Sequence, residues 1–337
     1  MKHRITWIDF GKGLTIFLVV IAHVLSGIYT NKVYLGKTDI VLSYFGETLF
    51  VVIMPVFFSL SGYLFKTPQT ISDYLIMVKK KAWNLLTPYV VFSIIYVVMT
   101  TLGGDKEYNW HSLLYIWYAP ISYLWFLYTL YFIFVLVGFR SFLKLNINIQ
   151  LLIYFIAFII IQFLNIQIPI FKTFGWAIFF ILGRIFKERQ KVLSSKLILC
   201  LTLLVSLAMI LIMFSCLGTS HALYNDLTFF NFIPKVMADI FMFSLFNTVS
   251  NKTRLYNYFE YYGKYSLIIY MVHAPVLSAT RAIILKVVKP NVLILVIILL
   301  TVGWYISLLV ICLSKKSKII NFIFNPYIYI NGKQSSE

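Results

Sequence analysis

The sequence has 337 residues, of which 61% are hydrophobic and only 12% are charged. Soluble domains average about 45–50% apolar and about 25% charged residues, so this composition excludes a disordered chain, a collagen-like chain and a disulfide-rich scaffold, and it argues against a soluble enzyme. The formal net charge of +18 does not indicate nucleic-acid binding, because that function needs a basic patch on a water-facing domain. The composition indicates a polytopic membrane protein.

Ten apolar segments are candidates for crossing the membrane, since a helix needs about 20 residues to span about 30 Å of hydrocarbon. They are residues 14–31, 42–65, 84–102, 121–139, 150–164, 170–186, 197–217, 228–249, 265–286 and 291–313. The fifth segment is short. We predict an all-α membrane protein of about ten transmembrane helices, organised as a single transmembrane domain over residues 1–337 without an appended soluble domain.

The positive charge predicts the topology. If the N-terminus lies in the cytoplasm, 21 of the 29 Lys and Arg residues fall in cytoplasmic segments and 6 fall on the outer side. Basic residues concentrate on the cytoplasmic side of membrane proteins. We therefore expect both termini in the cytoplasm. We also expect a multi-pass location in the plasma membrane.

A few ionisable residues fall inside the predicted spans, where they are costly and suggest function. They are His23, Glu47, Lys235, Asp239, His273 and Arg281. Lys235 and Asp239 are four residues apart on one helix, so they are expected to neutralise each other as a pair. Arg281 is expected to extend its charge towards the membrane surface. For His273 a hydrogen-bonded packing role is the simpler expectation.

Lys12 and His23 are aligned on the first predicted span. They are eleven residues apart, which at about 100° per residue places them about 20° apart on one helix face, with a rise of about 16 Å between them. Asp9 falls about 40° from His23 on the same face, if the helix extends back that far. Lys12 alone could be an interfacial anchor, and His23 alone could be a packing residue. Their alignment favours a shared, inward-facing role.

Glu47 lies near the outer end of the second span. By depth it could meet His23, orient the imidazole ring and stabilise the imidazolium, as acid–base catalysis requires. The alternative is a structural carboxyl group held by hydrogen bonds.

Several short segments occur in a characteristic order. They are WIDFGKG at 7–13 followed by FLVVIAH at 17–23, FFSLSGY at 57–63, KAWNLLTPY at 81–89, LWFL at 124–127, and GKYS at 263–266 running on to IYMVH at 269–273. Small residues in the second segment also allow close helix packing. Taken together, the segments resemble the integral-membrane acyltransferase family 3, which includes bacterial carbohydrate O-acetyltransferases. Lys12 and His23 fit its pattern of a basic residue, ten intervening positions and a histidine.

The resemblance implies acetyl transfer from cytoplasmic acetyl-CoA to a sugar hydroxyl of a cell-surface polysaccharide or its lipid-linked precursor. The catalytic candidates are then His23 and Glu47. The candidates for contacts with acetyl-CoA are Lys12, Asp9, Lys80 and Lys81, and no metal is expected. The substrate-pocket candidates are Ser61, Tyr63, Trp125 and His273.

One segment departs from the family pattern. The family often has paired arginines before the third span, and here Trp83 and Asn84 take that place. Ten spans with buried charges are also typical of a transporter or flippase of a lipid-linked saccharide, and a non-catalytic scaffold in a polysaccharide-assembly complex is a third reading. Membrane lipids are expected partners, a homo-oligomer or an assembly complex is conceivable, and nucleic acid is not expected.

Overall fold

The structure is a computed structural model that describes residues 5–103, 108–219, 225–249, 251 and 253–330. The described residues contain helices and no strand. Five of the basic residues that entered the topology prediction lie outside this range: Lys2, Arg4, Lys106, Lys252 and Lys333. The cytoplasmic placement of the termini stays a prediction.

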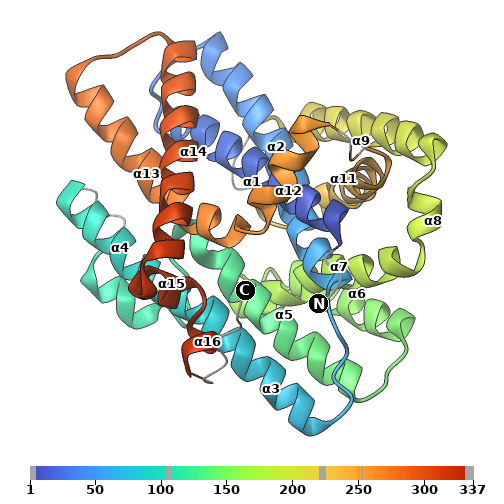
Figure 1. The fold of residues 1–337 in the computed structure, drawn as a ribbon. Helices are drawn as coiled ribbons and strands as arrows, with labels where there is room; N and C mark the ends of the chain where they lie inside the picture. Colours follow the sequence, from blue (N-terminus) through green and yellow to red (C-terminus); the bar gives the residue numbers. More distant parts are fainter. Residues whose placement is uncertain (1–4, 104–107, 220–224, 250, 252, 331–337) are drawn as a thin grey trace. The chain divides into compact units, whose positions relative to one another are not determined.

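Fifteen α-helices follow one another along the described chain (Figure 1). They are α1 (Thr6–Tyr29), α2 (Lys37–Tyr63), α3 (Ile71–Lys81), α4 (Thr87–Gly103), α5 (Trp125–Phe142), α6 (Ile147–Phe163), α7 (Pro169–Glu188), α8 (Gln190–Leu193), α9 (Lys196–Leu217), α11 (Phe229–Thr248), α12 (Arg254–Gly263), α13 (Ser266–Val287), α14 (Val292–Lys316), α15 (Lys318–Phe324) and α16 (Pro326–Ile330). Short 3₁₀ turns cover Trp110–Tyr115 and Ser122–Leu124, and a π-helical turn covers Ala82–Leu86.

Nine helical segments within the described residues are long and apolar enough to cross a membrane. They match nine of the ten predicted spans, although α1 begins at Thr6 rather than at residue 14, and the third segment, Ile71–Leu102, includes α3. The remaining prediction, 150–164, corresponds to α6, which has 17 residues. Its length of about 26 Å falls short of the hydrocarbon thickness. The all-α polytopic fold is confirmed.

The chain forms two compact units. The first unit comprises residues 1–65, 178–266 and 289–304, and the second comprises 66–177, 267–288 and 305–337. Six of the predicted site residues lie in the first unit: Asp9, Lys12, His23, Glu47, Ser61 and Tyr63. Lys80, Lys81, Trp125 and His273 lie in the second.

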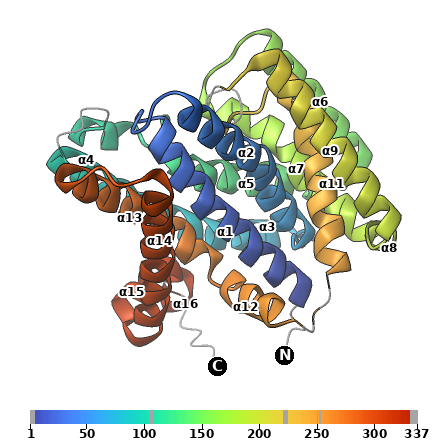
Figure 2. The same cartoon turned by 90° about the horizontal axis from the view of Figure 1, so that it is seen from above.

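The first unit is built around α1. In both views α2 runs beside α1, α12 crosses the beginning of α1, and α11 packs beside α9 (Figures 1 and 2). An apolar cluster fills the space between α1, α2, α11 and α12, and in it Phe10 stacks on Tyr256 with ring centroids 4.4 Å apart. This packing fixes the end of α1 that carries Asp9 and Lys12.

Two glycines allow α1 and α12 to touch through their backbones. A Cβ atom on Gly13 would lie 1.9 Å from the carbonyl oxygen of Phe259, and one on Gly263 would lie 1.8 Å from the carbonyl oxygen of Asp9. No side chain fits at such distances, so both positions require glycine. The WIDFGKG and GKYS segments, 250 residues apart in sequence, therefore meet at this contact.

A similar contact joins α2 to α7. A Cβ atom on Gly62 would lie 1.9 Å from the carbonyl oxygen of Phe180, and one on Gly183 would lie 1.9 Å from that of Ser59. Close approach through small residues is a common way for membrane helices to pack. The structure thus confirms the packing interpretation of the FFSLSGY segment.

In the second unit, α3 packs against α5 and leads into the π-helical turn. Pro88 follows this turn, and its missing N–H breaks the helical hydrogen-bond ladder at the carbonyl of Asn84. The Asn84 side chain accepts a hydrogen bond from the backbone N–H of Tyr327 in α16 at 3.3 Å. Asn84 thus anchors α16, the last helix of the described chain.

We expect Gly13→Ala to destabilise the protein by about 1–3 kcal/mol, because the new methyl group would overlap the Phe259 carbonyl. Thermal unfolding in detergent measures the effect. Leu35→Ala, at a residue that is 74% exposed, serves as the control and should leave the transition unchanged. Equal stability of the two variants would contradict the backbone contact.

Candidate active site

Lys12 and His23 lie on one continuous helix. Because α1 runs without interruption from Thr6 to Tyr29, the two residues are about 20° apart around its axis and about 16 Å apart along it. Both are half-buried, whereas their neighbours Gly11, Gly13 and Ala22 are buried. The alignment predicted from the sequence is therefore present in the structure.

The half-buried residues of α1 fall into two stripes. One contains Lys12, His23 and Gly27, within about 60° of one another. The other lies on the opposite side and is apolar; its members are Trp7, Leu14, Phe17, Leu18 and Ile21. The cation and the imidazole thus share a stripe that is separate from the apolar surface of the helix.

Asp9 is only 6% exposed and lies where α12 crosses α1. Its carbonyl oxygen contacts Gly263, so its backbone is fixed by the same contact that places Lys12 on the next turn. The predicted group of a carboxylate and an ammonium at the beginning of α1 therefore lies on a part of the helix that packs directly against α12.

Glu47 is completely buried on α2. The Tyr29 hydroxyl donates a hydrogen bond to its Oε1 atom. The His23 ring packs against Phe50, one turn from Glu47, with centroids 5.4 Å apart. The structure thus brings the two catalytic candidates onto packed faces of α1 and α2, and a direct contact between them stays a prediction.

Lys235 and Asp239 do not form the predicted pair. The Lys235 Nζ atom donates to the carbonyl oxygen of Asp226 at 2.5 Å and is within electrostatic range of the Glu47 carboxylate. Asp239 instead contacts the Ser59 hydroxyl at 2.5 Å. The prediction was wrong because tertiary contacts from α2 and from the segment before α11 supply other partners.

Ser61 and Tyr63 differ in their surroundings. The Ser61 hydroxyl donates to the carbonyl of Phe57 within α2 at 2.9 Å, and the residue is half-buried. Tyr63 is only 4% exposed, and its hydroxyl donates to Oε1 of Gln190 at 2.9 Å.

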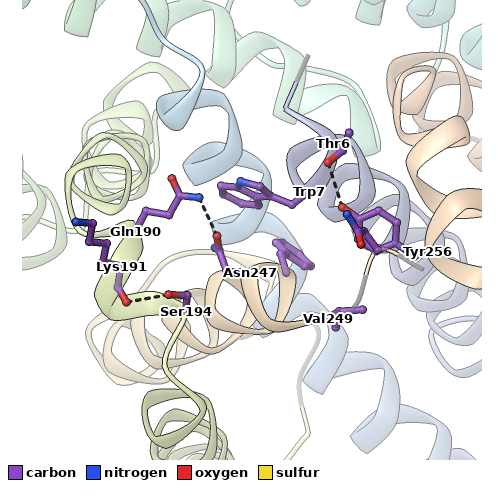
Figure 3. Close-up of a pocket in the computed structure, with 10 residues that line it drawn as sticks. Thr6, Trp7, Gln190, Lys191, Ser194, Asn247, Val249 and Tyr256 are labelled. Atoms are coloured by element: carbon purple, nitrogen blue, oxygen red, sulfur yellow. Dashed lines mark hydrogen bonds between the residues drawn. The ribbon is translucent and has the colours of Figure 1, made fainter. Parts of the chain in front are cut away.

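A pocket of about 460 Å³ opens at the beginning of α1 (Figure 3). The side chains that line it come from α1, α8, the end of α11 and the beginning of α12: Thr6, Trp7, Gln190, Lys191, Ser194, Phe246, Asn247, Val249, Asn251 and Tyr256. The Gln190 amide donates to Asn247 at 3.2 Å, and the Tyr256 hydroxyl donates to Thr6 at 3.5 Å. Thr6 and Trp7 lie about 120–140° around α1 from Lys12, so this pocket is separate from the Lys12–His23 stripe.

The two lysine candidates in the second unit lie over aromatic rings. The Lys81 Nζ atom is 3.7 Å from the ring centroid of Phe134, and that of Lys80 is 5.6 Å from that of Tyr327. Cation–π contacts of this kind hold an ammonium group without neutralising it. Both lysines come directly before the π-helical turn, a feature that is frequent at functional sites.

Trp125 and His273 also lie in the second unit. Trp125 begins α5 and is half-buried against Trp176, with centroids 5.5 Å apart. His273 is completely buried, and its Nδ1 atom is 3.0 Å from the carbonyl oxygen of Ile269. Its ring also contacts Tyr123 and Tyr270, so the hydrogen-bonded packing role expected for His273 is confirmed.

Comparison with known proteins identifies the family to which this chain belongs. The model of a family described as an acyltransferase domain matches residues 5–311. The chain belongs to acyltransferase family 3. Neither the comparison with curated proteins nor that with solved structures finds a match. The protein is thus a multi-pass membrane acyltransferase, and the matched range includes every predicted site residue.

Several residues of this region carry no signal in the sequence. Tyr29 contacts Glu47 from the end of the preceding helix, and Gln190 and Asn247 meet only through the packing of α8 against α11.

Tyr29→Phe should lower the free energy of unfolding by about 1–3 kcal/mol, because it removes the hydrogen-bond donor of a fully buried carboxyl group. Tyr44→Phe, at a 40% exposed tyrosine on α2, is the matched control. Thermal unfolding of both variants checks the difference. If the two variants unfold at the same temperature, the Tyr29 hydroxyl does not stabilise Glu47.

Proposed function

We propose that this acyltransferase moves an acetyl group from cytoplasmic acetyl-CoA to a sugar hydroxyl of a cell-surface polysaccharide or its lipid-linked precursor, in the plasma membrane of a bacterial cell. The observation that carries the proposal is the half-buried stripe of α1, with Lys12 at one end and His23 about 16 Å farther along.

Coenzyme A is a long anionic molecule with its thioester at the far end of a flexible arm. Lys12 lies towards the end of α1 that the charge distribution places in the cytoplasm, and its ammonium group is suited to hold a phosphate. The arm then runs along the stripe to His23. Lys80 and Lys81 are the further candidates for phosphate contacts, and Asp9 would orient Lys12.

His23 is positioned to take the proton from the attacking hydroxyl. The new C–O ester bond forms as the thioester C–S bond breaks, and the proton passes through His23 to the departing thiolate. Glu47 would stabilise the positive charge that His23 carries between these steps. A route through an acetylated histidine uses the same residue, so His23 is essential in both cases.

The four substrate-pocket candidates differ in burial and hydrogen bonding, and these differences favour two of them as contacts for the acceptor sugar. Tyr63 and His273 are buried and hydrogen-bonded within their own units. Ser61 and Trp125 are half-buried. An indole ring suits stacking on a sugar and a hydroxyl suits hydrogen bonding to one, so Ser61 and Trp125 are the better candidates.

His23→Ala should lower acetyl transfer by about 10²–10⁴-fold, the usual contribution of a general base. The release of free CoA thiol by purified protein, supplied with acetyl-CoA and glycan acceptor, measures the rate. His111→Ala is the control, because His111 is exposed and lies outside the stripe. Full activity of the His23 variant, with normal folding, would exclude His23 from the reaction.

Lys12→Ala should raise the KM for acetyl-CoA by about 10–100-fold with a smaller effect on kcat, since a charge-assisted hydrogen bond contributes about 1.5–3 kcal/mol. Lys12→Arg should retain most of the affinity. Lys32→Ala, which removes an exposed lysine beyond the other end of α1, is the control. An unchanged KM in Lys12→Ala would show that Lys12 does not contact the donor.

A further inference from the structure

Asp239 lies in the middle of α11, in a helix long enough to span the membrane, and none of its surface is exposed. The helix extends about 15 Å in each direction from this residue. An ionised carboxylate at such a position is very costly unless a cation and several hydrogen bonds compensate it.

The described contacts of Asp239 do not supply that compensation. Lys235, one turn away, donates to the carbonyl oxygen of Asp226. The Oδ2 atom of Asp239 lies 2.5 Å from the Ser59 hydroxyl oxygen, and among the described residues its Oδ1 atom has no hydrogen-bond partner. This environment suits a neutral carboxylic acid far better than an anion.

The number of protons available at Ser59 also indicates that the Asp239 carboxyl group is neutral. The Ser59 oxygen is 2.8 Å from the carbonyl oxygen of Phe179 and 2.5 Å from Oδ2 of Asp239. A carbonyl can only accept, so the single hydroxyl proton is needed for the contact with Phe179. The second short contact between oxygens needs another proton, and Asp239 is the group that can provide it.

We propose that Asp239 is held as a neutral carboxylic acid that donates its proton to Ser59, while Ser59 donates to the carbonyl of Phe179. The resulting chain of hydrogen bonds joins α11, α2 and α7 within the first unit. Asp239 is thus a positioning residue, and its role does not depend on which acyl donor or acceptor the enzyme uses.

The chain of hydrogen bonds holds α2, the helix that carries Glu47. α2 carries Glu47 in its first half and the FFSLSGY segment at its end. Ser59 lies beside the contact in which Gly62 and Gly183 bring α2 and α7 into backbone contact. A shift of α2 along α7 would break both arrangements, so the neutral acid sets the register of α2.

Infrared spectroscopy tests the protonation state directly. At neutral pH the wild-type protein should show a carboxylic-acid carbonyl band that Asp239→Asn removes and that Asp73→Asn, at an exposed capping residue, leaves in place. Identical spectra of the wild type and Asp239→Asn in this region would show that Asp239 is ionised and would overturn the proposal.

Replacement by the isosteric amide tests the positioning role. Asn can donate to Ser59 as the neutral acid does, so Asp239→Asn should keep the unfolding temperature and the acyl-transfer rate close to those of the wild type. Asp239→Ala and Ser59→Ala break the chain, and both should unfold at lower temperature. If Asp239→Asn lowers the unfolding temperature as much as Asp239→Ala does, donation to Ser59 is not the function of this carboxyl group.

Discussion

The backbone contact between α1 and α12 determines where the charged residues at the beginning of α1 lie. Gly13 and Gly263 remove the side chains that would keep the two helices apart, and each meets a carbonyl oxygen of the opposing helix. Lys12 is half-buried, whereas Gly11 and Gly13 on either side of it in the sequence are buried. The packing of α12 therefore presents Lys12 on the stripe that leads to His23.

Several buried polar groups of the first unit have their partners on another helix. Tyr29 of α1 contacts Glu47 of α2, and Ser59 of α2 connects Asp239 of α11 to the backbone of α7. In an apolar interior, removing the partner of such a group leaves a buried polar atom without its hydrogen bond, which lowers the stability of the protein. The first of these contacts links α1 to α2, and the other two link α2 to α11 and α7.

The sequence alone was sufficient for the features that depend on one segment. Hydropathy located nine spans, and the helical repeat placed Lys12 and His23 on one face. It was insufficient for features that depend on tertiary packing. The spacing of Lys235 and Asp239 predicted a pair, but competing partners came from other segments. Likewise, the pocket beside Trp7 combines residues from four helices and their links, which no local pattern brings together.

We propose that this membrane acyltransferase acetylates a cell-surface glycan. Mass analysis of surface glycans from cells that carry the gene and from cells that lack it is the test of this activity. Acetyl groups should disappear from one glycan when the gene is removed and return when it is restored. Identical acetylation in the two glycan preparations would contradict this proposal.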